Sequence, residues 1–160
     1  MVTGRLLGIA RKDRPKGVVE TIDHALIGLD TGVTGDHRGV PRSGKLPRRQ
    51  VTAMLLADWN AAMDELGHPP VRWSDRRVNL LVDGVDLPRS KGARLRIGAA
   101  LFEITGECDP CSRMEAVTPG LMAALTPEWR GGRTMRVVEA GEIAVGDPVS
   151  IETQIFREAV

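Results

Sequence analysis

Short apolar or alternating segments bounded by glycine and proline recur along the chain, and this pattern predicts β-strands. The predicted strands cover residues 5–10, 17–22, 50–56, 78–82, 94–97, 100–105, 134–139 and 149–155. The pair 94–97 and 100–105 is separated by Gly98-Ala99, which predicts a hairpin. Most of the secondary structure should therefore be β.

Two stretches have the apolar spacing of short helices instead. The first covers residues 58–66, with Asp58 as the N-cap and Gly67 closing the C-terminus. Its apolar stripe comprises Trp59, Ala62, Met63 and Leu66. The second follows Thr118-Pro119-Gly120, with Thr118 as N-cap, Pro119 at the first helical position, and Leu121, Met122 and Leu125 as apolar residues. Because strands and helices do not alternate, we expect a β-rich barrel with helical insertions rather than a parallel βαβ sheet.

Residues 30–49 interrupt the pattern with turn formers and charged residues. A loop of this length in a compact domain is usually functional or mobile. Asp36, His37 and Arg38 lie between Gly35 and Gly39, where glycine permits a close backbone approach to a ligand. His37 could titrate near neutral pH, although an Asp-His pair in a loop is a weak signal alone.

The composition is that of a globular protein, and we expect one domain over residues 1–160. Apolar residues make up 42% of the chain, and the formal net charge is only +1. A nucleic-acid-binding domain would carry a larger basic excess, so we expect no nucleic-acid partner. No apolar stretch is long enough to cross a membrane, and the N-terminus lacks a secretory signal. These features predict a soluble cytoplasmic protein.

Basic residues are concentrated in two parts of the chain. One set follows Asp36, and the second covers residues 72–96; together they comprise Arg38, Arg42, Lys45, Arg48, Arg49, Arg72, Arg76, Arg77, Arg89, Lys91, Arg94 and Arg96. They could be solvated surface. Alternatively, they could line a site for a small anion, since arginine matches phosphate and carboxylate geometry.

Both cysteines lie in one motif, Cys108-Asp109-Pro110-Cys111. Ser112 and Glu115 have capping-box spacing, and a capped turn would favour the Cys111 thiolate at its N-terminus. Three alternatives remain: a zinc site, for which the chain offers few further ligands; a thioredoxin-like redox pair; and two buried, inert thiols.

Arg77 and Asn79 would share one face of the predicted strand 78–82, because side chains alternate along a strand. A planar cation beside an amide can bind a phosphate or the edge of a heterocycle. The alternative is the exposed polar face of an edge strand.

Taken in order, several short motifs resemble the molybdenum cofactor sulfurase C-terminal (MOSC) domain family. They are G-D-H-R-G at 35–39, R-R-Q-V-T at 48–52, R-R-V-N-L-L-V at 76–82, G-V-D-L at 84–87, G-A-R-L-R-I-G at 92–98, P-C-S-R-M at 110–114 and I-A-V-G-D-P-V at 143–149. Val78 stands where the family often has a second arginine, so Arg77 is the surer match.

The resemblance implies a closed β-barrel of the pyruvate-kinase type with two or three short helices. It also implies that Cys111 ligates molybdenum or carries persulfide sulfur, and that Cys108 is dispensable.

The implied cofactor is molybdopterin, which is an anionic ligand. Its phosphate is expected to bind Arg48, Arg49 and Arg77, and its pterin edge Asn79. The other residues of the expected site are Asp36, His37 and Arg38. We expect no pyridoxal-phosphate-dependent half of the kind that full-length sulfurases have, so a separate reductase or cysteine desulfurase is an expected partner. The two function classes are a cofactor-dependent enzyme reducing N-hydroxylated substrates and a carrier without turnover.

Overall fold

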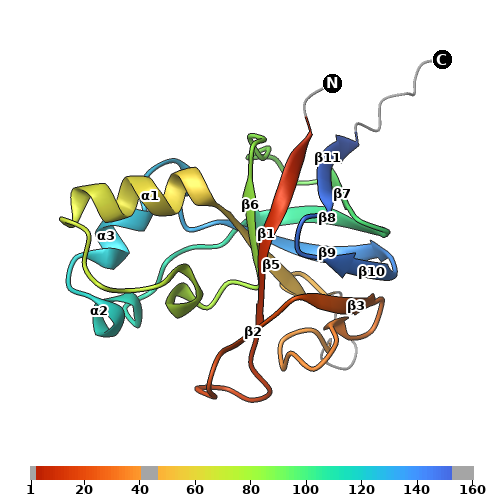
Figure 1. Ribbon diagram of the computed structural model, residues 1–160, viewed down its shortest axis with the longest axis horizontal. Helices are drawn as coiled ribbons and strands as arrows, with labels where there is room; N and C mark the ends of the chain where they lie inside the picture. The colour runs from red at the N-terminus through yellow and green to blue at the C-terminus, as the bar shows by residue number, and fades with distance from the viewer. Residues whose placement is uncertain (1–2, 41–46, 153–160) are drawn as a thin grey trace.

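The computed structural model describes residues 3–40 and 47–152, and seven of its strands form a closed β-barrel (Figure 1). Around the ring the order is β11, β7, β8, β9, β5, β6 and β1, and β1 pairs with β11 to close it. The barrel strands are β1 (Gly4–Arg11), β5 (Val51–Leu55), β6 (Leu80–Asp83), β7 (Arg94–Ile97), β8 (Ala100–Glu107), β9 (Arg133–Glu139) and β11 (Pro148–Glu152). The predicted β-barrel is therefore confirmed.

Strand pairing in the ring is antiparallel with one exception. At the closure, Gly4 pairs with Val149, and neighbouring strands β7 and β8 form the predicted hairpin. Only β5 and β6 run parallel, with Ala53 opposite Leu80. A parallel pair needs a long crossover, and here the crossover carries the first helix of the chain.

A second, three-stranded sheet lies beside the barrel, where β10 packs against β8 and β3 against β9 (Figure 1). Its strands are β10 (Gly141–Ala144), β3 (His24–Gly28) and β4 (Gly32–Val33). The sequence pattern did not predict these strands, because they are short and lie among turn-forming residues. Strand β2 (Glu20–Ile22), which pairs antiparallel with the end of β1, is shorter than the predicted strand 17–22. The expected end of the last strand, 153–155, lies outside the described residues.

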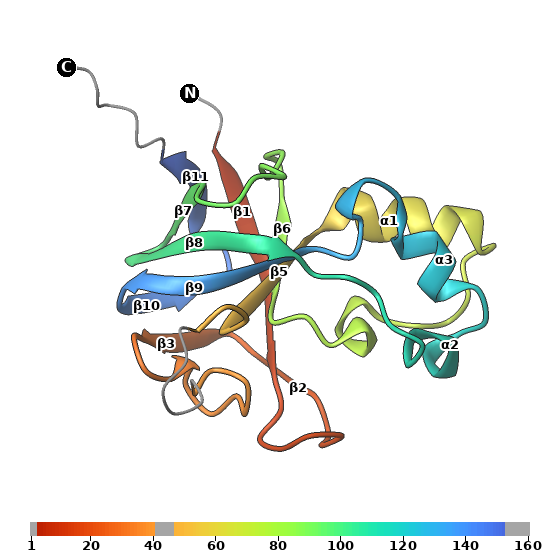
Figure 2. The ribbon, with the colours of Figure 1, turned by 180° about the vertical axis from the view of Figure 1, so that it is seen from behind.

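The helices gather on one side of the barrel (Figure 2). They are α1 (Leu56–Glu65), the 3₁₀ helix η1 (Trp73–Arg76), α2 (Met114–Val117), α3 (Leu121–Leu125) and the 3₁₀ helix η2 (Pro127–Trp129). A second apolar core joins them to β5 and β6, with Met54, Leu81, Trp59, Met63, Leu121 and Leu125 among its buried members. Among the described helices, none is long and apolar enough to cross a membrane.

The helix ends differ from the sequence-based predictions. Helix α1 begins at Leu56, so Asp58 lies in its first turn and is not the N-cap. Helix α3 begins at Leu121 with Gly120 as N-cap, so Thr118 and Pro119 lie before it.

The predicted Ser112–Glu115 capping box is also wrong. The Glu115 carboxylate accepts hydrogen bonds from the backbone N–H groups of Gly120 and Met122, each at 3.0 Å. It therefore caps the following helix, α3, rather than its own.

Candidate functional site

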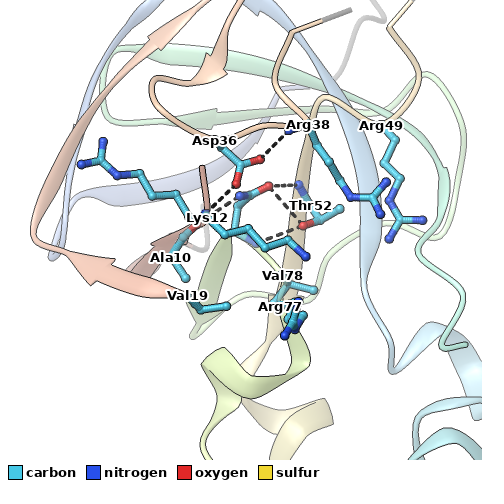
Figure 3. Close-up of a pocket in the computed structure, with 11 residues that line it drawn as sticks. Ala10, Lys12, Val19, Asp36, Arg38, Arg49, Thr52, Arg77 and Val78 are labelled. Carbon is cyan, nitrogen blue, oxygen red and sulfur yellow. Dashed lines mark hydrogen bonds between the residues drawn. The ribbon is translucent and has the colours of Figure 1, made fainter. Parts of the chain in front are cut away.

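A pocket opens where the end of β1, the turn at residues 36–38 and the segments before β5 and β6 meet (Figure 3). These segments are far apart in the sequence, and the closed barrel brings their ends together. We call this the cationic pocket. Its lining residues are Ala10, Arg11, Lys12, Val19, Asp36, Arg38, Arg49, Thr52, Arg77, Val78 and Asn79.

Four basic side chains of the pocket are directed toward the same opening (Figure 3). They come from four different segments: Lys12, Arg38, Arg49 and Arg77. Among the ion pairs that the described residues form within 4.0 Å, none involves these four. The pocket thus has positive charge without a carboxylate partner.

The one acidic residue of the pocket, Asp36, binds backbone instead of the basic side chains. Its carboxylate accepts the N–H of Lys12 at 3.0 Å and the N–H of Arg38 at 3.2 Å. Asp36 is buried, and these two bonds tie the 36–38 turn to the end of β1. Asp36 therefore has a structural role in the pocket, because it fixes the backbones of Lys12 and Arg38 relative to each other.

Burial and the neighbouring cations lower the proton affinity of two basic side chains of the pocket. Burial lowers the pKa of the Lys12 ammonium to about 8, and the neighbouring guanidinium groups of Arg77 and Arg38 act in the same direction. Burial, followed by Arg49 and Arg113, also lowers the pKa of Arg38. An anion in the pocket would relieve this repulsion, so the charge distribution favours anion binding.

Arg77 and Asn79 both line the pocket, but not through a shared strand face. Strand β6 begins at Leu80, and Arg77 is the C-cap of η1 in the left-handed region, with φ 69°. Asn79 is buried, and its side-chain N–H donates to the Ala10 carbonyl at 3.0 Å. The predicted shared strand face of Arg77 and Asn79 is wrong, because residues 77–79 lie between a 3₁₀ helix and the start of β6. The apolar pattern of the sequence does not reveal this 3₁₀ helix.

A wider groove adjoins the cationic pocket, and Val19 and Arg77 line both. The outer groove measures about 410 Å³, against about 20 Å³ inside the cationic pocket. Its other lining residues are Lys16, Gly17, Val18, Arg72, Asp75 and Val117. The inner space suits a small group, so the body of a larger ligand would extend past Arg77 into the outer groove.

Three expected site residues lie outside the pocket lining: Arg48, His37 and Cys111. The Arg48 side chain is exposed, and its backbone carbonyl accepts a hydrogen bond from the Thr105 hydroxyl. His37 donates its backbone N–H to the Lys12 carbonyl at 2.9 Å, and burial lowers its pKa. Its Nε2 is buried without a hydrogen-bond partner among the described residues.

Sequence reasoning missed Lys12. The available signal was its position directly after the first predicted strand, beside Arg11. Its proximity to residues 36–38 depends on tertiary structure alone.

The two cysteines have different environments. Cys111 is exposed, whereas Cys108 is fully buried in the core beneath the helices. Its sulfur accepts hydrogen bonds from Arg49 at 3.6 Å and from Arg76 at 3.5 Å. Both thiols are free, so the structure contains no Cys108–Cys111 disulfide. Among the described residues, no group of three His, Cys, Asp or Glu side chains could hold a metal ion.

The fold and the site together define a β-barrel domain with a helical layer and a cationic pocket at their junction. The family model for the MOSC domain matches residues 35–150, and the chain belongs to this family. The predicted family is therefore confirmed over most of the chain.

Solved structures show the same fold. The YuaD protein of Bacillus subtilis is 20% identical, with a TM-score of 0.73, and the match covers 94% of this chain and 98% of that one. YiiM of Geobacillus stearothermophilus is 17% identical, with a TM-score of 0.69 over 96% of this chain and 77% of that one. YiiM of Escherichia coli is 14% identical, with a TM-score of 0.64 over 94% of this chain and 71% of that one. A comparison with curated proteins found no match.

Proposed function

We propose that this MOSC domain binds the molybdenum cofactor, with the cofactor's phosphate in the cationic pocket. The observation that carries the proposal is the convergence of basic side chains without carboxylate partners among the described residues: Lys12, Arg38, Arg49 and Arg77. Charge-assisted hydrogen bonds of this kind are among the strongest that a protein offers a phosphate.

The residues present fit such a ligand. Arg77 lies at the junction of the cationic pocket and the outer groove, so it can hold a phosphate while the organic body lies beyond it. The Asn79 side-chain oxygen accepts a hydrogen bond from the Thr52 N–H, and one side-chain N–H donates to the Ala10 carbonyl. The second N–H of that amide group is the donor we assign to the pterin edge. Asp36 and His37 support the 36–38 turn.

Cys111 is the residue we propose as the molybdenum ligand. It is exposed, and a thiolate is a soft ligand that suits such a metal. When bound, the cofactor supplies a metal that changes oxidation state, which suits reduction of N-hydroxylated substrates with electrons from a separate reductase. The chain's own residues hold the anion, neutralise its charge and present the thiolate.

A sulfur carrier is the second candidate, and the exposure of Cys111 favours it. A persulfide must pass from a partner, such as a cysteine desulfurase, to an accessible thiol. Cys111 meets this condition, whereas Cys108 is fully buried. In this case the pocket would bind the cofactor that receives the sulfur, without turnover.

Metal and pterin content after mild purification tests the proposal. We expect near-equal molybdenum and pterin, measured by elemental analysis and by fluorescence of the oxidised pterin. Arg77→Ala should lose both, whereas Arg14→Ala, which removes a charge from an exposed loop outside the pocket, should lose neither. Bound cofactor together with reductase-coupled turnover supports the enzyme, and bound cofactor without turnover supports the carrier. Absence of pterin after reconstitution contradicts cofactor binding.

A further inference from the structure

Behind the cationic pocket lies a buried cluster formed by Cys108 and Arg76. Arg76 Nη2 donates to the carbonyls of Gly131 at 2.9 Å and Cys108 at 3.0 Å, and it lies 3.5 Å from the Cys108 sulfur. Arg76 is only 4% exposed and Cys108 is 0% exposed. The cluster therefore joins the chain before β6 to the chain after β8 within the interior.

The packing around this cluster is tight. A Cβ added at Gly131 would lie 2.6 Å from the Cys108 carbonyl oxygen and 3.1 Å from Arg76 Nη2, so a side chain there would displace the network. Arg76 forms no ion pair with the carboxylates of the described residues, and its Nε has no hydrogen-bond partner among them. Two neutral carbonyls and one sulfur thus surround a buried cation. Burying a charge without a charged partner costs free energy, and a purely structural role does not require it.

The cluster reaches the pocket by two routes. The direct route is Arg49, whose Nη2 donates to the Cys108 sulfur at 3.6 Å while the residue lines the pocket. Arg49 is exposed, and this is the one side-chain hydrogen bond that the described residues give it. Without it, the long side chain would have to be ordered by each incoming anion.

The indirect route is the backbone. Arg77 follows Arg76 and has a φ of 69°, in the left-handed region that non-glycine residues rarely adopt. Because Arg76 is anchored on both Cys108 and Gly131, the preceding residue is fixed in place. This anchoring favours the conformation that directs Arg77 to the pocket.

We infer that Cys108 is a positioning residue for the anion site, acting through Arg49 directly and through Arg76 on Arg77. The inference rests on the proposed anion pocket and deepens it. It assigns a task to the cysteine that the family motif does not include. Cys108 neither ligates the metal nor pairs with Cys111 in this arrangement. Its sulfur orients the Arg49 guanidinium directly, and it contacts the Arg76 guanidinium, which anchors the residue before Arg77.

Sulfate binding to the full chain at pH 7, measured by calorimetry, tests this inference. Loss of one hydrogen bond to a pocket arginine should weaken binding about three- to tenfold. We therefore expect this loss in Cys108→Val, and recovery of most of the affinity in Cys108→Ser, whose hydroxyl can still accept from Arg49. A structural role alone would not produce this difference at equal thermal stability.

A double-mutant cycle separates positioning from general damage. In an Arg49→Ala background, Cys108→Val should weaken sulfate binding by less than it does in the wild type, because the direct route through Arg49 is gone and only the route through Arg76 and Arg77 remains. If the valine variant fails to fold, Cys108→Ala compared with Cys108→Ser provides the same test.

Three results would overturn the inference. Wild-type affinity in Cys108→Val would overturn it while leaving the anion pocket intact. Full additivity of Cys108→Val and Arg49→Ala would do the same. Absence of sulfate binding in the wild type would overturn the pocket and the positioning role together.

Discussion

Asn79 and Thr52 are joined by three hydrogen bonds. The Asn79 side-chain oxygen accepts from the Thr52 N–H at 3.0 Å and from the Thr52 hydroxyl at 3.2 Å, and the Asn79 N–H donates to that hydroxyl at 3.0 Å. On its other side, the Asn79 backbone carbonyl accepts from the Ala10 N–H at 2.7 Å, and its side-chain N–H donates to the Ala10 carbonyl. Asn79 thus connects β5 with β1 at the floor of the pocket.

Asn79→Ala should lower the free energy of unfolding by about 3 kcal/mol, because it leaves buried groups of Thr52 and Ala10 without partners. Urea denaturation measures this change. Asn60→Ala, on the exposed side of α1, is the matched control and should change it by less than about 0.5 kcal/mol. Equal effects of the two substitutions would show that the Asn79 network does not stabilise the fold.

Lys12→Met should raise the free energy of unfolding and lower the affinity of the pocket for anions. The substitution removes a buried charge whose pKa is lowered to about 8, so we expect a gain of about 1 kcal/mol in the free energy of unfolding at pH 7. Sulfate affinity should fall several-fold, since one of the four pocket cations is lost. Thermal unfolding and calorimetry measure the two effects, and Lys91→Met at an exposed position should show neither.

The same residue sets a pH dependence. In the unfolded chain a lysine titrates near 10.4, but folded Lys12 loses its proton near 8, so the unfolded state binds more protons between these values. The free energy of unfolding should therefore gain a contribution from Lys12 as pH rises from about 8 to 10, while sulfate affinity falls. Lys12→Met should lack both effects. An unchanged pH profile in that variant would assign them to other groups.

Arg77→Ala should weaken cofactor retention about tenfold or more, because a charge-assisted hydrogen bond contributes about 1.5–3 kcal/mol. Arg77→Gly tests whether the left-handed backbone matters, since glycine adopts a φ of 69° without strain. Both variants should lose affinity to a similar extent if the guanidinium is the binding group. Unchanged affinity in Arg77→Ala, with the fold intact by circular dichroism, would exclude this role.

Iodoacetamide at pH 7 should label Cys111 much faster than Cys108, because Cys111 is exposed and Cys108 is fully buried. Peptide mass spectrometry at successive times measures both rates. In the same framework, Cys111→Ser should lose metal or persulfide loading, and Cys108→Ser should keep most of it. Faster labelling of Cys108, or equal inactivity of the two serine variants, would contradict the assignment of Cys111.

The barrel could be predicted because its strands carry their own signals. The alternation at β7 and β8, with Gly98-Ala99 between them, defines a hairpin without tertiary information. The second sheet had no such signal, since Gly32–Val33 is a two-residue strand inside a turn-rich stretch. The start of α3 was misplaced because Glu115 reaches forward to Gly120, which local capping rules do not anticipate.

Part of the pocket lining could be predicted from the sequence. Arg38, Arg49 and Arg77 were singled out by charge and motif, and all three line the pocket. Lys12 was not, because its nearness to the 36–38 turn depends on how β1 enters the barrel. The burial of Cys108 was equally hidden, since only the folded chain places Arg49 and Arg76 beside it.

The pairing of β1 with β11 also determines the order in which the domain can be completed during synthesis. Strand β1 is synthesised before the other strands of the ring, and Val149, the partner of Gly4 across the seam, lies in the last of them. Until then the Gly4–Arg5 end of β1 lacks its partner at the seam and can pair with another chain. The seam edge of β1 is therefore open to wrong strand pairing until every other strand of the ring has been made.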